Sequence, residues 1–233
     1  RHGKGGVRMA SVNEWMVREY LEALGFLVRQ PRKYQVVARS KGIHEEVDLL
    51  AVNPLAKAGA AFPEDMLWGA RELAQVPGVI VAVRGWHSER FTAAMLASSP
   101  EIYRFAEPDS VRAAAAEMGM DPPAKVLCMA DLPADPDQRA EALEFLRSQG
   151  IDGVILFRPM LLELAERVDV KKTYEKSDLL QILRILKNYD LLRSGQMDLF
   201  RQTRRRRAAP PRPDRTEDLP LGDGADGREG PDA

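Results

Sequence analysis

Three carboxylates in the first 48 residues of the chain are spaced so that they could hold a divalent cation. Glu46 and Asp48 lie two residues apart in a run from 45 to 54, whose apolar residues predict a strand that Pro54 ends. Side chains alternate between the faces of a strand, so these two carboxylates share a face. Glu14 is a third candidate, on a predicted helix. Mg²⁺ takes oxygen ligands and needs few from the protein when phosphates supply the others.

The elements that must position these residues follow from local patterns. Residues 13–25 place apolar side chains at helical spacing, with Ser11 or Asn13 as a cap and Gly25 as a stop. An extended stretch from 26 to about 39 and the strand bearing Asp48 predict a hairpin, joined by a turn at 40–42. The apolar run 78–85 predicts a third strand, in the middle of its sheet.

The second half of the chain alternates strands and helices. We expect short helices near 65–73, 88–97 and 110–118, strands at 125–130 and 151–157, and helices at 137–149, 159–168 and 177–193. Apolar residues surround most of the last helix, which predicts that it is buried on most sides. Such alternation favours an α/β fold with a central mixed sheet of about five strands flanked by helices.

The order helix, strand, turn, strand bearing Asp48, and strand ending in Ala82-Val83-Arg84 resembles the PD-(D/E)xK nuclease superfamily. The likeness spans about residues 11–130 and implies a restriction-endonuclease-like core. It also implies a metal-dependent endonuclease, if the site is active, that cleaves phosphodiester bonds with Mg²⁺-bound water. Asp48 matches the first acid of the motif, Glu14 is placed like the helix acid, and Arg84 stands where the lysine would be.

The sequence departs from this motif at two positions. Ala82 replaces the second acid and has no ligand atom, and the guanidinium of Arg84 cannot accept a proton as a lysine amine can. Asp48 with Glu14 or Glu46 would then hold the metal, while Arg84 stabilises charge on the phosphate. We therefore expect a degenerate nuclease that binds DNA or RNA. A non-catalytic scaffold or protein-interaction module that retains the fold is the alternative.

Residues suited to nucleic-acid binding surround this constellation. Lys and Arg can contact phosphates, and aromatic rings can stack on bases. The residues chosen on this basis are Arg29, Arg32, Lys33, Arg39, Lys41, Trp86 and His87. Basic side chains also protect the edges of sheets, and an indole also covers a hydrophobic core, so both interpretations stay open for these residues.

The carboxylates have structural interpretations as well. Asp48 could form an ion pair with Arg84 or Arg39, and Glu14 could complement the dipole of its own helix. The sequence does not decide between these roles and metal binding.

Composition limits the remaining choices. The chain has 233 residues, 34 basic and 35 acidic side chains, and one cysteine, Cys128, which we expect to be a buried, inert thiol. These features favour a reducing compartment, the cytoplasm, and no long apolar run predicts a membrane span. Charge is uneven, with nine basic and three acidic residues in 1–41. We expect a disordered or non-native start at 1–9, one domain at 10–198 with the extension at 131–198, and a disordered tail at 199–233.

Overall fold

The computed structural model describes residues 12–31, 47–57, 59, 61–87, 90–120 and 122–192. All of these belong to the first of two units into which the chain divides, Arg1–Ser194 and Gly195–Ala233. The predictions for 1–9 and 199–233 therefore lie outside the described residues. So do five candidate site residues: Arg32, Lys33, Arg39, Lys41 and Glu46.

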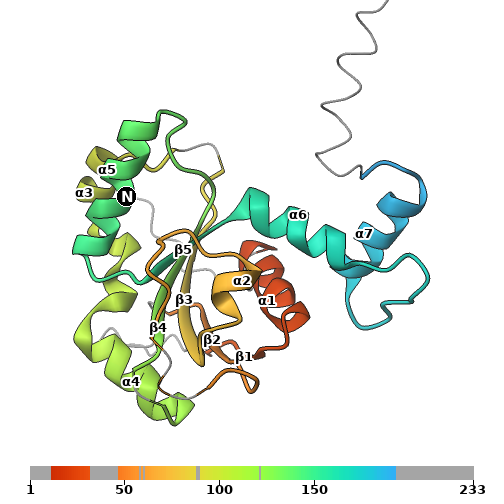
Figure 1. Ribbon diagram of the computed structural model, residues 1–233, viewed down its shortest axis with the longest axis horizontal. Coiled ribbons are helices and arrows are strands. Elements are labelled where there is room, and N and C mark those ends of the chain that lie inside the picture. The colour runs from red at the N-terminus through yellow and green to blue at the C-terminus, as the bar shows by residue number, and fades with distance from the viewer. Residues whose placement is uncertain are drawn as a thin grey trace, which may run out of the picture. The chain divides into compact units, whose positions relative to one another are not determined.

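The described part contains one sheet of five strands in the order β1-β2-β3-β4-β5 (Figure 1). β2 is antiparallel to both β1 and β3, whereas β3, β4 and β5 run parallel to one another. The predicted α/β fold with a mixed five-stranded sheet is thus confirmed. The strands are β1 (Leu27–Arg29), β2 (Leu49–Val52), β3 (Gly78–Arg84), β4 (Ala124–Met129) and β5 (Gly153–Leu156).

Helices cover both faces of this sheet, and glycines end some of them as the sequence predicts. Gly25 and Gly150 follow α1 and α5 with positive φ values of 94° and 81°, a conformation that glycine adopts without strain. The helices are α1 (Val12–Ala23), α2 (Ala70–Leu73), α3 (Ala93–Ser98), α4 (Pro108–Met118), α5 (Pro136–Ser148), α6 (Phe157–Arg167) and α7 (Asp178–Asn188), with 3₁₀ turns η2 (Pro100–Ile102) and η3 (Arg104–Ala106).

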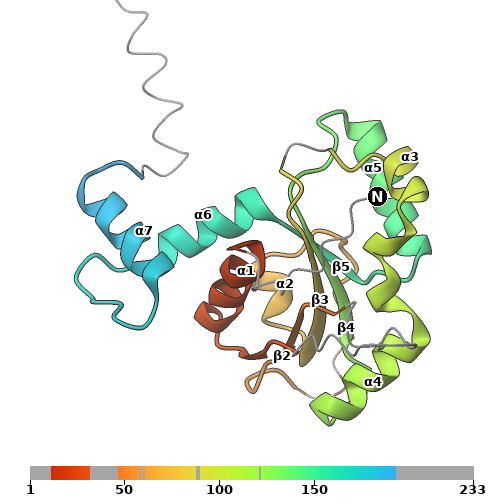
Figure 2. The same cartoon turned by 180° about the vertical axis from the view of Figure 1, so that it is seen from behind.

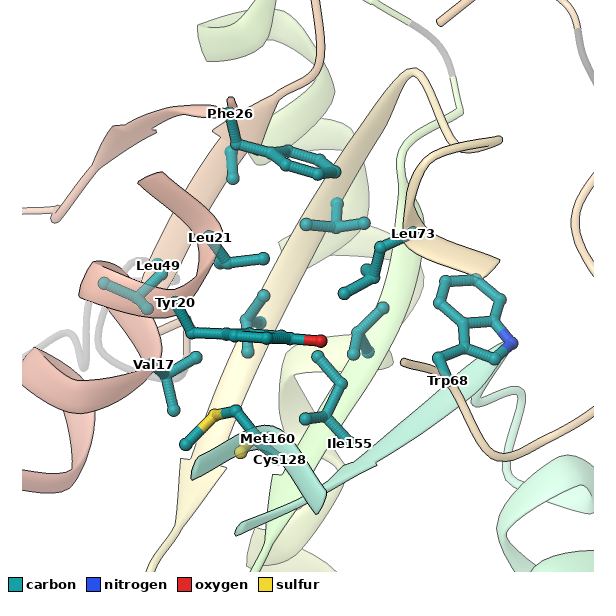
Figure 3. Close-up of a cluster of buried hydrophobic side chains, with 14 of the residues drawn as sticks. Val17, Tyr20, Leu21, Phe26, Leu49, Trp68, Leu73, Cys128, Ile155 and Met160 are labelled. Carbon is teal, nitrogen blue, oxygen red and sulfur yellow. The ribbon is translucent and has the colours of Figure 1, made fainter. Parts of the chain in front are cut away.

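Alternation along β3 divides the hydrophobic core into two clusters. Val81 belongs to a cluster that includes residues of α1 and α6, whereas Ile80 and Ala82 belong to the one that includes residues of α3, α4 and α5. Figure 2 shows these two groups of helices on opposite faces of the sheet. Figure 3 shows Tyr20 and Leu21 of α1 pointing into the first cluster. β3 therefore forms the middle of the core, as its apolar sequence predicts.

The prediction that the last helix is buried on most sides is wrong. In α7 only Leu183 is buried, whereas Ile182 and Ile185 are 51% and 43% exposed. Its described packing is against α6, so one side of the helix is enough to attach it. Within the described ranges, no other element buries the remaining apolar residues of α7.

Some predicted boundaries also shift. The helix expected near 65–73 occupies only Ala70–Leu73, and that expected at 88–97 starts at Ala93, after Thr92 caps it by accepting from the Met95 amide. β1 has three residues, and most of the extended stretch predicted to follow it lies outside the described residues. Across the described ranges, no helix has the length and apolarity needed to cross a membrane.

Candidate nucleic-acid interface

The candidate residues gather at one edge of the sheet because of the strand directions. β3 ends at Arg84, and β2 runs the opposite way, so its start lies at the same edge. Asp48 directly precedes β2, and its backbone amide donates to the Val81 carbonyl at 2.9 Å. β1 is also antiparallel to β2, which brings the end of β1 to this edge. Residues that are far apart in the sequence thus become neighbours.

Asp48 and Arg84 form a largely buried ion pair. Oδ2 of Asp48 accepts from Nη1 of Arg84 at 3.0 Å and from the Val83 amide at 2.7 Å. The two side chains are only 5% and 15% exposed. The same guanidinium donates to the carbonyls of Val83 at 3.1 Å and Glu101 at 3.4 Å. The arrangement is a charge-assisted network in which the cation beside Asp48 is supplied by the protein itself.

Ala82 lies on the core side of this pair. It is fully buried, in the cluster that also contains Ile80 and Leu127. The pairing of β2 with β3 begins at Leu49 and Val81, and the Asp48 amide also bonds to the Val81 carbonyl, so Asp48 lies just outside the regular register. An acid at 82 would therefore enter the hydrophobic core.

Within the described residues, the candidate ligands do not form a Mg²⁺ site. Ala82 has no donor atom. Asp48 already accepts from a guanidinium and an amide through one oxygen, and Glu14 accepts from the side-chain amide of Gln30. No group of three or more His, Cys, Asp or Glu that could hold a metal ion occurs within the residues described. Glu46, the remaining candidate ligand, lies outside them.

Glu14 contacts the end of β1. Its Oε2 accepts from Nε2 of Gln30 at 2.7 Å, and Gln30 directly follows the last residue of β1. The helix acid thus comes to the expected edge of the sheet. This contact with Gln30 links α1 to β1.

Asn13 fastens the start of α1 to the segment that follows β3. Its Nδ2 donates to the Gly85 carbonyl at 3.3 Å, and its Oδ1 is 3.0 Å from Nε2 of His87. A Cβ atom at position 85 would lie 1.8 Å from Nδ2 of Asn13, so only glycine allows this approach. Sequence reasoning gave Asn13 only a capping role, because nothing local in the sequence indicates a partner 72 positions away.

Two aromatic contacts complete this edge. Trp86 stacks on Phe91, with ring centroids 5.8 Å apart and an interplanar angle of 12°. His87 meets Phe157 edge to face, with ring centroids 4.8 Å apart. Trp86 remains 39% exposed, whereas Phe91 is fully buried. The indole therefore covers the core on one side and faces solvent elsewhere.

Arg29, the one described member of the basic hairpin set, has an acidic neighbour. Its Nη1 lies 2.9 Å from Oε1 of Glu117 on α4, and its side chain is 69% exposed. A pair this exposed contributes little stability, and its guanidinium keeps most of its surface in solvent.

Comparison of the chain with known protein families, with curated proteins and with solved structures found no match. The function must therefore be inferred from the geometry of this edge.

Proposed function

We propose that the protein binds DNA or RNA without cleaving it, as a catalytically degenerate protein of the PD-(D/E)xK type. The observation that carries this proposal is the ion pair between Asp48 and Arg84. The two residues that match the motif meet at one edge of the sheet, but they bond to each other. The guanidinium supplies the positive charge that a metal ion would otherwise bring to Asp48.

The order and directions of the elements support the resemblance. α1 is followed by three strands of which the middle one, β2, is antiparallel to its neighbours, and then by a parallel strand, β4. Asp48, directly before β2, and Arg84, at the end of β3, support a comparison with the first acid and the lysine of that motif. α1 contributes its first turn to the same edge through Asn13 and Glu14.

The loss of cleavage follows from the donor set. Hydrolysis of a phosphodiester by a metal-bound water needs a site that holds the ion, and Ala82 offers no ligand atom. Binding of a polyanion needs only cations and surfaces at the right place. Pro31 and Val47 bound the segment that carries the basic residues 32, 33, 39 and 41, and both lie beside strands that reach this edge. We include a cytoplasmic location in the proposal because the single cysteine suits a reducing compartment.

The test measures binding and cleavage together. Fluorescence anisotropy with labelled oligonucleotides should show an affinity that falls steeply between about 50 and 200 mM salt, because each neutralised phosphate releases counterions. Reversing the charge of Arg32 and Lys33 together should weaken binding at least tenfold. The matched control reverses Lys171 and Lys172, two adjacent exposed lysines after α6, and should change affinity little.

Two results would overturn the proposal. Cutting of plasmid or single-stranded DNA that requires Mg²⁺ or Mn²⁺, and that Asp48→Asn abolishes, would show an active nuclease. Absence of salt-dependent binding to any oligonucleotide would leave the scaffold or interaction module, which the formal charge of −1 favours.

A further inference from the structure

Trp86 presents an exposed aromatic surface at the edge where the ion pair lies. Trp86 lies two residues after Arg84. Its side chain is 39% exposed, whereas that of Trp68 is 4% exposed. Leaving an indole in water forgoes the stabilisation that burial of so large an apolar group provides. A ligand that covers the exposed indole would recover this stabilisation.

The surroundings of Trp86 hold its ring in one orientation. Phe91 lies beneath it, near-parallel and fully buried. The residues on both sides of Trp86 are fastened to α1 by one side chain, since Asn13 contacts the Gly85 carbonyl and the His87 ring. The His87 amide also donates to the Gly85 carbonyl at 3.0 Å, which closes a tight turn around the indole. A surface fixed in this way loses little side-chain entropy when a ligand binds.

We propose that this surface stacks on an unpaired base, so that the protein prefers single-stranded nucleic acid. This inference rests on the proposed function and specifies its substrate class. In a duplex the faces of each base are covered by its neighbours, and only edges reach the grooves. An unpaired base can instead place its face on the indole and extend the stack that Phe91 and Trp86 begin.

A protein partner is the competing occupant, because tryptophan is also common where proteins meet. The position of Trp86 favours a base. It lies two residues after Arg84, the last residue of β3, whereas the exposed apolar side chains Ile182 and Ile185 belong to α7 and Tyr189 directly follows that helix. A surface for polynucleotides and one for proteins would then use different elements.

The experiment compares a labelled oligothymidylate with a duplex of the same length, using the full chain and its variants. We expect tighter binding of the single strand, with quenching of tryptophan fluorescence. Trp86→Ala and Trp86→Leu should each raise the dissociation constant for the single strand roughly fivefold or more, and Trp86→Phe should retain most of the affinity while abolishing most of the quenching. Tyr189→Ala, which removes an aromatic residue that is 74% exposed, is the control and should bind normally.

The outcomes separate this inference from the function on which it rests. Equal, salt-dependent affinity for both oligonucleotides that Trp86→Ala leaves unchanged would overturn the stacking surface and retain the nucleic-acid-binding function. No binding to either oligonucleotide would overturn both. Unchanged binding together with reduced self-association of Trp86→Ala in sedimentation would replace the base with a protein partner. A loss in Trp86→Leu that Trp86→Phe does not share would support the stacking surface, because both variants keep an apolar side chain.

Discussion

The pair of Asp48 and Arg84 stabilises the fold at the positions that we compare with the acid and the lysine of a nuclease motif. Both side chains are largely buried, and the carboxylate also accepts from a backbone amide of β3. A buried charge without its partner is costly, so each residue depends on the other. The pair ties the start of β2 to the end of β3.

A double-mutant cycle measures that dependence. Asp48→Asn or Arg84→Met alone should lower the free energy of unfolding by about 2–4 kcal/mol, because each leaves a buried group without its partner. The double variant should lose less than the sum, with a coupling of about 1–3 kcal/mol in urea denaturation. The exposed pair of Arg18 and Glu22 on α1 is the control, with a coupling of at most about 0.5 kcal/mol. A coupling near zero for Asp48 and Arg84 would contradict the structural role.

The sequence alone suggested an ion pair between Asp48 and Arg84, but it did not decide between Arg84 and Arg39 as the partner of Asp48. Asp48 had two candidate cations, and only the register of β2 against β3 brings Arg84 to it. The contacts of the Asn13 side chain with Gly85 and His87 could not be predicted, because they depend on how α1 crosses the sheet. Burial of Ala82 followed from the apolar run of β3.

At the scale of elements, α6 and α7 form a pair joined by one lysine. Nζ of Lys187 on α7 donates to the carbonyls of Ala165 at 2.9 Å and Val168 at 2.6 Å, at the end of α6. A positive charge at a helix C-terminus also complements the helix dipole. Arg184 adds a contact from its Nε to the Val170 carbonyl at 3.0 Å. With one buried residue on α7, these polar contacts carry much of the attachment.

Replacing Lys187 should therefore loosen α7 from α6. Lys187→Met keeps an apolar stem but leaves the carbonyls at the end of α6 without this donor, which should cost about 1–2 kcal/mol. Hydrogen exchange should become faster in the last turn of α6 and throughout α7, with little change in β3. The control is Lys176→Met, at an exposed lysine before α7. Equal exchange in both variants would show that apolar packing alone holds the helix.

The helices also show where periodicity predicts well and where it does not. α1, α4, α5 and α6 lie close to the predicted ranges, because each has an apolar stripe that meets the sheet. α7 carries its apolar residues mainly on one wide face, of which only Leu183 is buried, and an apolar face does not say how much of it finds a partner. Burial of that helix depends on what else reaches it, which no local pattern contains.

At the scale of the whole molecule, two groups that must stay uncharged lie in the hydrophobic cluster that includes residues of α1 and α6. Burial raises the pKa of the Cys128 thiol well above its ordinary value. Burial, followed by the hydrogen bond to Glu163, likewise raises the pKa of the Tyr20 hydroxyl. Tyr20 donates to Oε2 of Glu163 at 2.5 Å, and the same oxygen accepts from the Ala70 amide at 3.0 Å. This contact connects α1, α2 and α6 across the core.

Stability should consequently fall in alkaline solution. Both pKa values are higher in the folded than in the unfolded protein, so the unfolded state releases these protons first as the pH rises. The contribution of each group is present below its ordinary pKa, near 9 for cysteine and 10 for tyrosine, and is lost above it. Each group should remove up to about 1.4 kcal/mol per pH unit.

Denaturation curves between about pH 8 and 11 test this expectation. Cys128→Ala should lose the part of the decline that begins near pH 9, and Tyr20→Phe the part that begins near pH 10. Each variant is less stable at neutral pH, so the slope rather than the value is compared. A slope equal to that of the parent protein in both variants would refute the assignment.

The fold class was within reach of the sequence because the apolar strand runs and helix stops are local signals. The five strands, their mixed directions and the burial of Cys128 agree with the predictions. The face on which each helix packs was not predictable, because it depends on crossovers that join residues far apart in the chain. The same holds for the candidate site, whose residues come from α1, β2 and β3.

The burial of position 82 beside the ion pair restricts how this edge can evolve. Gaining a second carboxylate through Ala82→Asp would place a charge in the core, and exchanging Arg84 for lysine would break the geometry that neutralises Asp48. Either mutation is harmful before the other arrives. A substitution of Asp48 or Arg84 alone should therefore be costlier than the replacement of both, and sequences derived from this one should keep the two residues together or lose them together.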